Sequence, residues 1–432
     1  MTADADEKPT IDHMMAAYLF SERGKTQVEI ADLMGISQSK ASRLLSKAKE
    51  LNVYREERVF NIKKSPELEE MIHSLLHNSD AVSQLRQYQA AFHADGVDAN
   101  CYLRSVEIVH ANRPDKRASV EFDKDQHYKY TKEFSQRAGE FLGHSMQDER
   151  VFGLSWGAVV YFSCETFVKA IENVDGMTRF VAAAPTITSG RNAFSAGAIC
   201  GIANIQLGTV NDVSNFRSFA VPAFIQRAYR NTPYPGASGE TERAKFVRLS
   251  LEGSKHYVAT LGGYTDRDPT TAASVFGTFI TGLGRFEDPY GKNLDDFLSA
   301  INSEGSEDPV GEADIRRFYV GDFAGALLIK SDLSEDDRKR AEEYRDLWTG
   351  IRVEDMREIT RRAGTENAHG GVSHGVVAIG AGRDRALVLL AALEQGVVSK
   401  LLVDEPLYDE LMSQASKRLH KRAVDLAAKE KR

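Results

Sequence analysis

The feature that most constrains the fold is an alternation of strand-like and helix-like segments between about residues 100 and 410. Helical stretches such as 130–146 and 385–397 separate several runs that are rich in β-branched, aromatic and small apolar residues. The strand-like runs are 101–111, 150–156, 180–187, 216–224, 257–264, 326–330, 376–382 and 400–405. Such a repeat is typical of a largely parallel sheet covered on both faces. We therefore expect an α/β protein with a large, doubly wound, mostly parallel sheet domain.

Three polar insertions interrupt this alternation, at about 231–245, 286–313 and 331–345. The first is rich in Pro and Gly, and the other two are acidic. Their composition predicts surface excursions that lie outside the core.

A small all-α domain is expected before the sheet domain, because residues 26–53 have the pattern of a helix-turn-helix. Thr26 is a candidate N-cap whose capping box Glu29 completes, Gly35 lies where the chain turns sharply, and Ser37 is the N-cap of a second helix. The inward-facing positions share a small or apolar side chain and are Ile30, Ala31, Leu33, Ile36, Ala41, Leu44, Leu45 and Ala48.

The outer face of this unit predicts contact with double-stranded operator DNA. Residues 38–64 hold eight Lys or Arg against three Glu, a net charge of +5, whereas the whole chain has a formal charge of −8. Short polar groups at the start of a recognition helix suit base edges, and cations further along suit phosphates. The predicted DNA-binding residues are Gln27, Gln38, Ser39, Lys40, Ser42, Arg43 and Lys47. The alternative is a helical hairpin with a solvated basic face.

The chain is expected to divide into a helix-turn-helix domain (1–62), a linker or oligomerisation helix (63–94) and an effector-binding and oligomerisation domain (95–432). The apolar stripe of 67–92 suits packing on the next domain or pairing of two helices. The basic tail from Ser416 is interpreted as a solvated last helix, with contact to nucleic acid as the alternative.

Composition excludes several other classes of protein. Three scattered cysteines, Cys101, Cys164 and Cys200, are too few for a disulfide framework or a zinc site. His369 and His374 lie in a Gly-rich loop that supplies no further metal ligands. We expect no metal, no cofactor, no catalytic residue and no membrane span, and we expect a cytoplasmic protein.

Six segments, taken in order, resemble the SorC-type family of sugar-binding bacterial transcriptional regulators. AYLFSERGKTQVEIADLMGISQSKASRLLSKAKELNV is similar to the DNA-binding signature of that family. The later matches are ERVFGLSWGAVV, AVPAF, VGDFAGALL, WTGIRVEDMREI and VVAIGAGRDRALVLLAALEQGVVSKLLVDEPLYDELM. The resemblance covers about residues 14–412, apart from the acidic insertions.

This resemblance implies a winged or sigma-like helix-turn-helix followed by an effector domain related in fold to ribose-5-phosphate isomerase and glucosamine-6-phosphate deaminase. It also implies a homo-oligomer, a dimer or a tetramer, whose affinity for its operator changes when a sugar or a phosphorylated sugar binds.

The effector site is expected at the carboxyl edge of the sheet, where the turns that follow parallel strands meet. The turn at 153–159 would expose N–H groups at a helix N-terminus, which favours an anion, although such a turn is often only a connection. The candidate effector-binding residues are Gly153, Ser155, Trp156, Gly157, Ala158, Val159, Ser189, Gly190, Arg191, Gly263, Asp322 and Arg385. Arg191 and Arg385 are alternatively partners in structural ion pairs. Asp322, expected at the start of a strand, is alternatively a turn cap.

Carried over from the family, the turn at 153–159 is the phosphate cradle, Asp322 contacts sugar hydroxyls and Arg385 lies near the ligand. This chain differs from the family at two points. Ala158 and Val159 stand where the family has a hydroxyl residue, and Arg385 stands where the family has Lys. A less anionic ligand and a loss of effector binding therefore both stay open.

These patterns together predict a transcriptional regulator controlled by a small carbohydrate-type effector, and no enzyme. The alternatives are a constitutive DNA-binding protein whose large domain only oligomerises, and an enzyme of the sugar-phosphate isomerase type.

Overall fold

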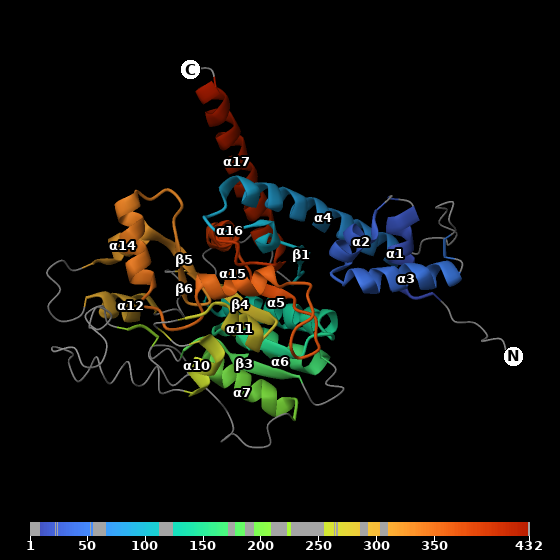
Figure 1. Cartoon of the computed structure of the whole chain (residues 1–432), viewed down its shortest axis with the longest axis horizontal. Helices are drawn as coiled ribbons and strands as arrows, with labels where there is room; N and C mark the ends of the chain where they lie inside the picture. Colours follow the sequence, from blue (N-terminus) through green and yellow to red (C-terminus); the bar gives the residue numbers. More distant parts are fainter. Residues whose placement is uncertain are drawn as a thin grey trace. The chain divides into compact units, whose positions relative to one another are not determined.

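The computed structural model describes most of the chain. The described residues are 9–21, 23, 25–51, 53–54, 66–111, 124–171, 178–185, 194–208, 223–225, 255–262, 264, 267–285, 293–302 and 310–430. They fall into two compact units (Figure 1). The first comprises Met1–Gln87 with Arg104–Val106, and the second comprises Tyr88–Leu103 with Glu107–Arg432.

The first unit contains the expected helix-turn-helix, formed by α2 (Gln27–Met34) and α3 (Gln38–Glu50) after α1 (Ile11–Ser21). The Thr26 side chain accepts a hydrogen bond from the N–H of Glu29, whose carboxylate accepts one from the N–H of Thr26. Gly35 ends α2 with φ +63°, a left-handed conformation that glycine adopts without a steric penalty. The Ser37 side chain accepts from the N–H of Lys40. The predicted caps are confirmed.

Small side chains let the three helices approach closely. The fully or nearly buried residues of this core are Ala16, Ala17, Leu19, Ile30, Ala31, Ala41, Leu45, Ala48, Val53 and Tyr54. Leu33, Ile36 and Leu44 pack against this cluster and are partly buried. The predicted inner faces of both helices are therefore confirmed.

A long helix, α4 (Pro66–Phe92), follows the first three helices in the chain. It lies within the segment for which the sequence predicts a linker or oligomerisation helix. Its last five residues, from Tyr88 onward, belong to the second unit.

The second unit is built on a sheet whose central strands are parallel. The main strand order is β1 (Ser105–Ile108), β8 (Lys400–Val403), β7 (Gly375–Gly380), β4 (Thr278–Gly284), β2 (Val151–Leu154) and β3 (Arg179–Ala182). The pairs β2–β3, β2–β4, β4–β7 and β7–β8 are parallel. All residues of β7 and β8 are buried, so both faces of these strands are covered. The predicted fold class is confirmed.

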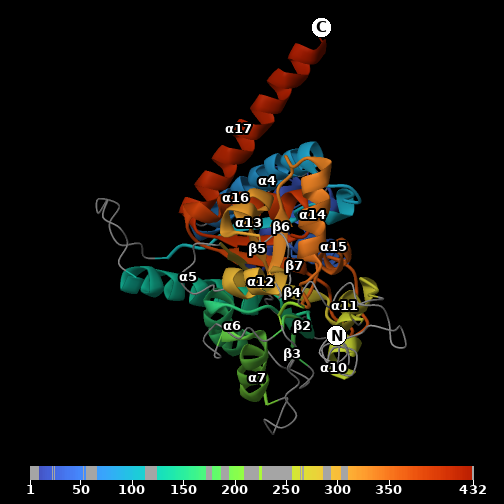
Figure 2. The ribbon, with the colours of Figure 1, turned by 90° about the vertical axis from the view of Figure 1, so that its left-hand side faces the viewer.

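An antiparallel hairpin continues the sheet beyond β4. Its strands are β5 (Tyr319–Phe323) and β6 (Ala326–Ile329), and β5 pairs with the end of β4. The other elements of the unit are η1 (Ala99–Cys101), η4 (Arg383–Arg385), α5 (Lys124–Ser145), α6 (Ala158–Ala170), α7 (Ala196–Gln206), α10 (Lys255–Leu261), α11 (Thr270–Val275), α12 (Asn293–Ile301), α13 (Glu312–Phe318), α14 (Glu335–Arg345), α15 (Val353–Arg361), α16 (Ala386–Glu394) and α17 (Glu405–Glu430). Figure 2 shows their arrangement around the sheet.

The strand order reverses between β2 and β4. The chain passes from β2 to β3 on one side, returns to β4 on the other side of β2, and continues outward to β7 and β8. At such a switch point the connections diverge, and a crevice is expected at the carboxyl ends of the two strands. The effector site predicted from the sequence would lie at this reversal.

Two strand predictions are wrong. Residues 257–261, expected in a strand, lie in the helix α10, because the buried Tyr257, Thr260 and Leu261 follow a helical spacing of three and four residues. The central strand β4 was not predicted, because glycines in and around this short apolar segment obscure its period. Most of the strand expected at 216–224 lies outside the described residues.

The acidic insertions are not simple surface excursions. Phe297 and Ile301 of α12 and Tyr344 of α14 belong to a second hydrophobic core cluster, which also contains Leu327 and Ile329 of β6. The prediction is wrong here because a few apolar residues at helical spacing are enough to anchor a helix whose other residues are charged. The insertion at 231–245 lies outside the described residues.

Two further observations concern the described residues only. None of their helices combines the length and the apolar character that crossing a lipid bilayer requires. Cys101, Cys164 and Cys200 are free thiols and all three are buried.

Candidate functional site

The exposed face of α3 carries the predicted DNA-binding residues. Gln38, Ser39, Lys40 and Arg43 are exposed, whereas Ala41, Leu45 and Ala48 on the opposite face are buried. Ser42 and Lys47 are half-buried, and Gln27 is exposed at the first position of α2. The helix thus separates its polar face from its apolar face completely.

Arg43 and Lys47 of this face have partners on α3 itself. The Arg43 Nε donates to the carbonyl of Ser39 at 3.4 Å, one turn earlier on the same helix. Lys47 lies 3.6 Å from the exposed Glu50 carboxylate, and this ion pair is open to solvent and therefore weak. No carboxylate precedes Glu50 within α3. The basic residues after Tyr54, which raise the charge of this region in the sequence, lie outside the described residues.

The second candidate site begins at the end of β2, where Gly153 and Ser155 have structural roles. Gly153 lies inside the strand, and a Cβ there would come within 2.6 Å of the Phe276 ring, so this glycine permits close packing. Gly153 was expected in the turn, and that placement is wrong. Ser155 is fully buried, and its hydroxyl donates to the Thr281 hydroxyl on β4 at 2.9 Å.

Gly157 forms the turn between β2 and α6. Its φ of +116° is accessible mainly to glycine, and a Cβ at this position would meet nothing within 4 Å. The N–H of Gly157 donates to the Phe194 carbonyl at 2.9 Å. Ala158 and Val159 begin α6, and the N–H groups of a first helical turn have no acceptor within the helix. The turn therefore has the form of an anion-binding helix N-terminus.

The Trp156 indole approaches the β5–β6 hairpin. Its Nε1 is buried, and within the described parts of the chain it has no hydrogen-bond acceptor. A Cβ on Gly325, in the turn of the hairpin, would lie 3.1 Å from this nitrogen. The Trp156 indole N–H is thus a buried donor without a partner among the residues that the structure describes.

Asp322 lies in the same hairpin, but not at the start of a strand as expected. It is the fourth of five residues in β5, opposite Gly284 of β4 and Leu327 of β6. The prediction is wrong because β5 and β6 form two short strands joined by a tight turn at Ala324 and Gly325. The Oδ1 of Asp322 accepts from the N–H of Gly325 at 3.1 Å, and the residue is 8% exposed. Asp322 therefore caps this turn.

Arg385 crosses from the end of β7 to the end of β4. Its guanidinium donates to the Ala381 carbonyl at 3.0 Å and to the Leu283 carbonyl at 3.4 Å, and the side chain is 11% exposed. The neighbouring Asp384 lies 2.5 Å from Arg285, at the end of β4. Arg385 thus fixes two strand ends, and its ion pair with Asp384 is longer, at 3.5 Å.

The structure brings four of the predicted effector residues together around the second half of β4 and the hairpin that pairs with its end. Ser155, Asp322 and Arg385 contact or pair with residues of β4, and Trp156 approaches the turn of the hairpin. Ser189, Gly190, Arg191 and Gly263 lie outside the described residues.

Sequence reasoning missed Asp404, which organises the loop between β7 and α16. This buried carboxylate accepts from the N–H groups of Gly382 and Leu407 at 3.0 and 2.9 Å, and from the Tyr130 hydroxyl at 2.7 Å. The signal in the sequence is an Asp placed directly after a strand and before Glu-Pro, a typical start of a helix.

A buried polar cluster joins the end of α16 to the end of α4. The Tyr88 hydroxyl donates to Glu394 Oε1, and Arg418 of α17 lies 2.9 Å from both. Burial raises the pKa of the Glu394 carboxyl and that of the Tyr88 hydroxyl. We call Tyr88, Glu394 and Arg418 the α4 clamp.

The neighbouring Gln89 adds a second link between α4 and the end of α16. Its side chain donates to the Leu393 carbonyl at 3.0 Å and accepts from the N–H of Leu103 at 2.9 Å.

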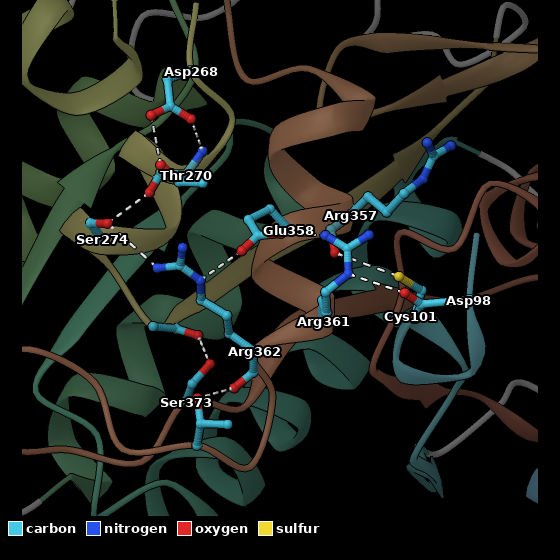
Figure 3. A network of polar contacts seen from close by, with 12 residues as sticks. Asp98, Cys101, Asp268, Thr270, Ser274, Arg357, Glu358, Arg361, Arg362 and Ser373 are labelled. Carbon is cyan, nitrogen blue, oxygen red and sulfur yellow. Dashed lines mark hydrogen bonds and ion pairs between the residues drawn. The ribbon is translucent and has the colours of Figure 1, made fainter. Parts of the chain in front are cut away.

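A second polar network fastens the segment after α4 to α15 (Figure 3). Arg361 pairs with Asp98 at 3.4 Å, and the Cys101 thiol donates to the Arg357 carbonyl at 3.9 Å. Burial raises the pKa of this thiol. Further along the helix, Glu358 accepts from Arg362 at 2.8 Å. The network makes α15 a support for η1 and the residues around it.

Comparison with solved structures finds transcriptional regulators. The chain is similar to the full-length sorbitol operon regulator SorC from Klebsiella pneumoniae, with 13% identity and a TM-score of 0.43 over 93% of this chain and 98% of that one. It is similar to a DeoR family transcriptional regulator from Listeria monocytogenes, with 13% identity and a TM-score of 0.42 over 78% of this chain and 99% of that one. A transcriptional regulator from Streptococcus pneumoniae has 13% identity and a TM-score of 0.45 over 78% and 98%. No family model and no curated protein matches the chain.

Proposed function

We propose that this protein is a DNA-binding transcriptional regulator whose second unit binds a small carbohydrate-type effector. The observation that carries the proposal is α3, a capped helix with a buried apolar face and an exposed face of amide, hydroxyl and cationic side chains. A helix of this kind can enter the major groove with its first turn toward base edges.

Gln38 and Ser39 lie in the first turn of α3 and are assigned to base contacts, with Gln27 at the start of α2. Lys40, Arg43 and Lys47 are assigned to phosphates, because each neutralised phosphate releases counterions and strengthens binding. A single small unit buries little surface on DNA, so we assign the active form to a homo-oligomer that binds two half-sites.

The crevice at the carboxyl end of β4 is assigned to the effector. The N-terminus of α6 favours an anionic group, whereas the Trp156 indole donor and the Asp322 carboxylate suit hydroxyl groups. This combination supports a sugar, with a phosphorylated sugar as the form that uses the helix N-terminus. The motifs that resemble the SorC-type family support the same class of ligand.

The helix α16 is assigned as the link between the effector and α4. It starts next to Arg385 at the crevice and ends at Glu394 in the α4 clamp. A ligand that shifts Arg385 therefore acts on the same rigid element that holds Tyr88. Coupling requires that the effector bind more tightly to one position of α16 than to the other.

Fluorescence anisotropy with duplexes from the region upstream of its own gene tests the DNA-binding proposal. We expect binding that is specific, weakens steeply with salt, and changes at least about fivefold when one member of a panel of sugars and phosphorylated sugars is present. If no duplex binds at low ionic strength with any member of the panel, the proposal is wrong.

A second candidate function is constitutive DNA binding by a protein whose second unit does not sense a ligand. It is favoured by the engagement of Asp322 and Arg385 with backbone groups of the chain itself. A thermal-shift screen separates the two candidates, because a ligand that binds only the folded protein raises its melting temperature. If operator binding is tight and no sugar or phosphorylated sugar shifts the melt, the constitutive function is correct.

A further inference from the structure

The distal half of α17 leaves the body of the second unit. The first half of the helix buries Leu407, Leu411 and Ala415, but every residue from 421 to 426 is exposed. Figures 1 and 2 show this half of α17 extending beyond the other helices of the unit. A helical segment of this length without tertiary contacts is marginally stable in water. The surface beside the distal half of α17 therefore indicates what kind of partner could cover this segment.

A groove of about 730 Å³ runs beside the point where α17 leaves the body. One wall is the face of α17 formed by Arg418, Lys421, Arg422, Asp425 and Leu426. The opposite wall contains Phe92, residues 330–332 after β6, and Leu387 and Ala391 of α16. Leu387 and Leu426 are 46% and 53% exposed, so both ends of the groove present apolar side chains to solvent.

The charges of this face fall into two groups. Arg418 pairs with Glu394 at 2.9 Å, and the Arg422 guanidinium lies 5.0 Å from the centre of the Phe92 ring. Lys421 and Asp425, by contrast, form no ion pair within the described part of the chain. They are four residues apart, so they lie one turn apart on the same face of α17.

We propose that this groove holds α17 of a second copy of the chain, packed antiparallel to the first about a two-fold axis. A two-fold interface must be self-complementary, since each residue meets its counterpart in reversed order. With the axis near residue 423, Lys421 faces Asp425 of the partner subunit, and Asp425 faces Lys421 of the partner subunit. Filling the groove in this way also removes Leu387 and Leu426, which line it, from contact with water.

Double-stranded DNA is a poorer occupant of the groove. Asp332, Glu394 and Asp425 line it together with the cations, so a phosphate backbone would meet carboxylates as well as cations there. A second copy of α17 offers charges of both signs in matching order.

This inference deepens the homo-oligomer part of the proposed function and rests on it. The test measures molar mass against concentration by light scattering and sedimentation, using the full chain and the variants Lys421→Glu, Asp425→Lys and Lys421→Glu/Asp425→Lys. Each single change turns two symmetry-related attractions into repulsions. We expect each to weaken self-association at least about tenfold, and the double change to restore it. The matched control is Lys339→Glu, an exposed charge reversal on α14 outside the groove, which is expected to leave the mass unchanged.

Circular dichroism of each variant separates a loss of association from a loss of folding, and the restored double variant excludes a merely structural effect. If folded single variants keep the wild-type mass, or if the double variant fails to recover it, the assignment of this groove is wrong. It is equally wrong if Lys421→Glu lowers DNA affinity while the mass stays unchanged. If the wild-type protein is monomeric at every concentration, the proposed homo-oligomer is wrong, and the proposed α17 interface is wrong with it.

Discussion

Tyr88 and Glu394 form a direct hydrogen bond across 306 residues of sequence, and the bond is fully buried. Tyr88 lies near the end of the helix that follows the DNA-binding unit in the chain, and Glu394 is the last residue of the helix that starts at the candidate effector site. The bond thus joins α4 directly to α16.

Loss of this bond is expected to weaken the coupling between the two sites. Tyr88→Phe removes one hydroxyl, and the cost of a lost hydrogen bond is on the order of 1 kcal/mol, so we expect the ratio of operator affinities with and without effector to fall about fivefold. Effector binding and operator binding, measured separately, should persist. Tyr257→Phe is the matched control, because its buried hydroxyl donates to the Thr349 carbonyl at 2.7 Å, away from the clamp. If Tyr88→Phe and Tyr257→Phe show the same ratio of operator affinities with and without effector, the α4 clamp does not couple the two sites.

Operator binding is expected to depend on Arg43. Removing its guanidinium in Arg43→Ala should weaken binding by about 1–3 kcal/mol if it contacts a base, and should lower the salt slope by about one if it contacts a phosphate. Lys339→Ala, which removes an exposed cation of α14, is the control and should bind as the wild type. Anisotropy titrations at three salt concentrations distinguish these outcomes. Unchanged affinity in Arg43→Ala would argue against α3 as the recognition helix.

The turn at Gly157 is expected to be essential for the effector response. In Gly157→Asp a carboxylate would lie beside the N-terminus of α6 and would compete there with an anionic group of the ligand. We expect the effector response to disappear while operator binding is kept. Gly157→Ala is the control for backbone strain, because it places a Cβ at the same positive φ without adding a carboxylate. A normal response in Gly157→Asp would refute the assignment of the site.

A buried ion pair between Arg267 and Asp355 is expected to hold α11 and α15 together. The two groups are 2.5 Å apart, and their side chains are 4% and 1% exposed. Arg267→Met leaves a buried carboxylate without its cation, which should lower the free energy of unfolding by about 3–5 kcal/mol. Arg316→Met, which breaks an exposed pair with Glu312, should cost less than about 1 kcal/mol. Urea titrations of the two variants provide the comparison, and equal losses would contradict it.

The pH dependence of stability is expected to contain a contribution from Glu394. Burial raises the pKa of this carboxyl above its ordinary value of 4.5. Between pH 4.5 and this raised pKa, the folded state therefore holds a proton that the unfolded state has released. Stability from this group is therefore present below pH 4.5 and is lost as the pH rises through the raised pKa. In Glu394→Gln this loss should vanish, whereas the exposed Glu312→Gln should keep it. Unfolding free energies between pH 4 and 7 test the sign.

The helix-turn-helix could be predicted in detail from the sequence because its signals are local. Thr26, Gly35 and Ser37 each act on hydrogen bonds within four residues. Local patterns also indicated most of the parallel strands. They failed at α10, where a short apolar run suits a strand or a buried helix equally, and at β4, whose glycines serve contacts with distant residues. Gly284, for example, leaves room for Asp322 of β5.

The candidate effector site could be predicted only in part for the same reason. Spacing along the chain predicted which turns lie at the edge of the sheet. It did not predict which side chains at this edge already form hydrogen bonds within the protein. Arg385 donates to the Leu283 carbonyl at the end of another strand, Asp322 lies opposite Gly284 of β4, and Asp404 acts on a loop that precedes it by about twenty residues. Such contacts depend on the strand order, which no local pattern reports.

The way α4 is held has a geometric consequence for reading DNA. The stretch from Pro66 to Tyr88 is about 33 Å long at 1.5 Å per residue, so a rotation of about 6° at its anchored end moves its other end by about 3.4 Å. That displacement is about the rise of one base-pair step. In the proposed homo-oligomer, a tilt of this size would therefore be enough to shift one recognition helix by one base-pair step relative to the other.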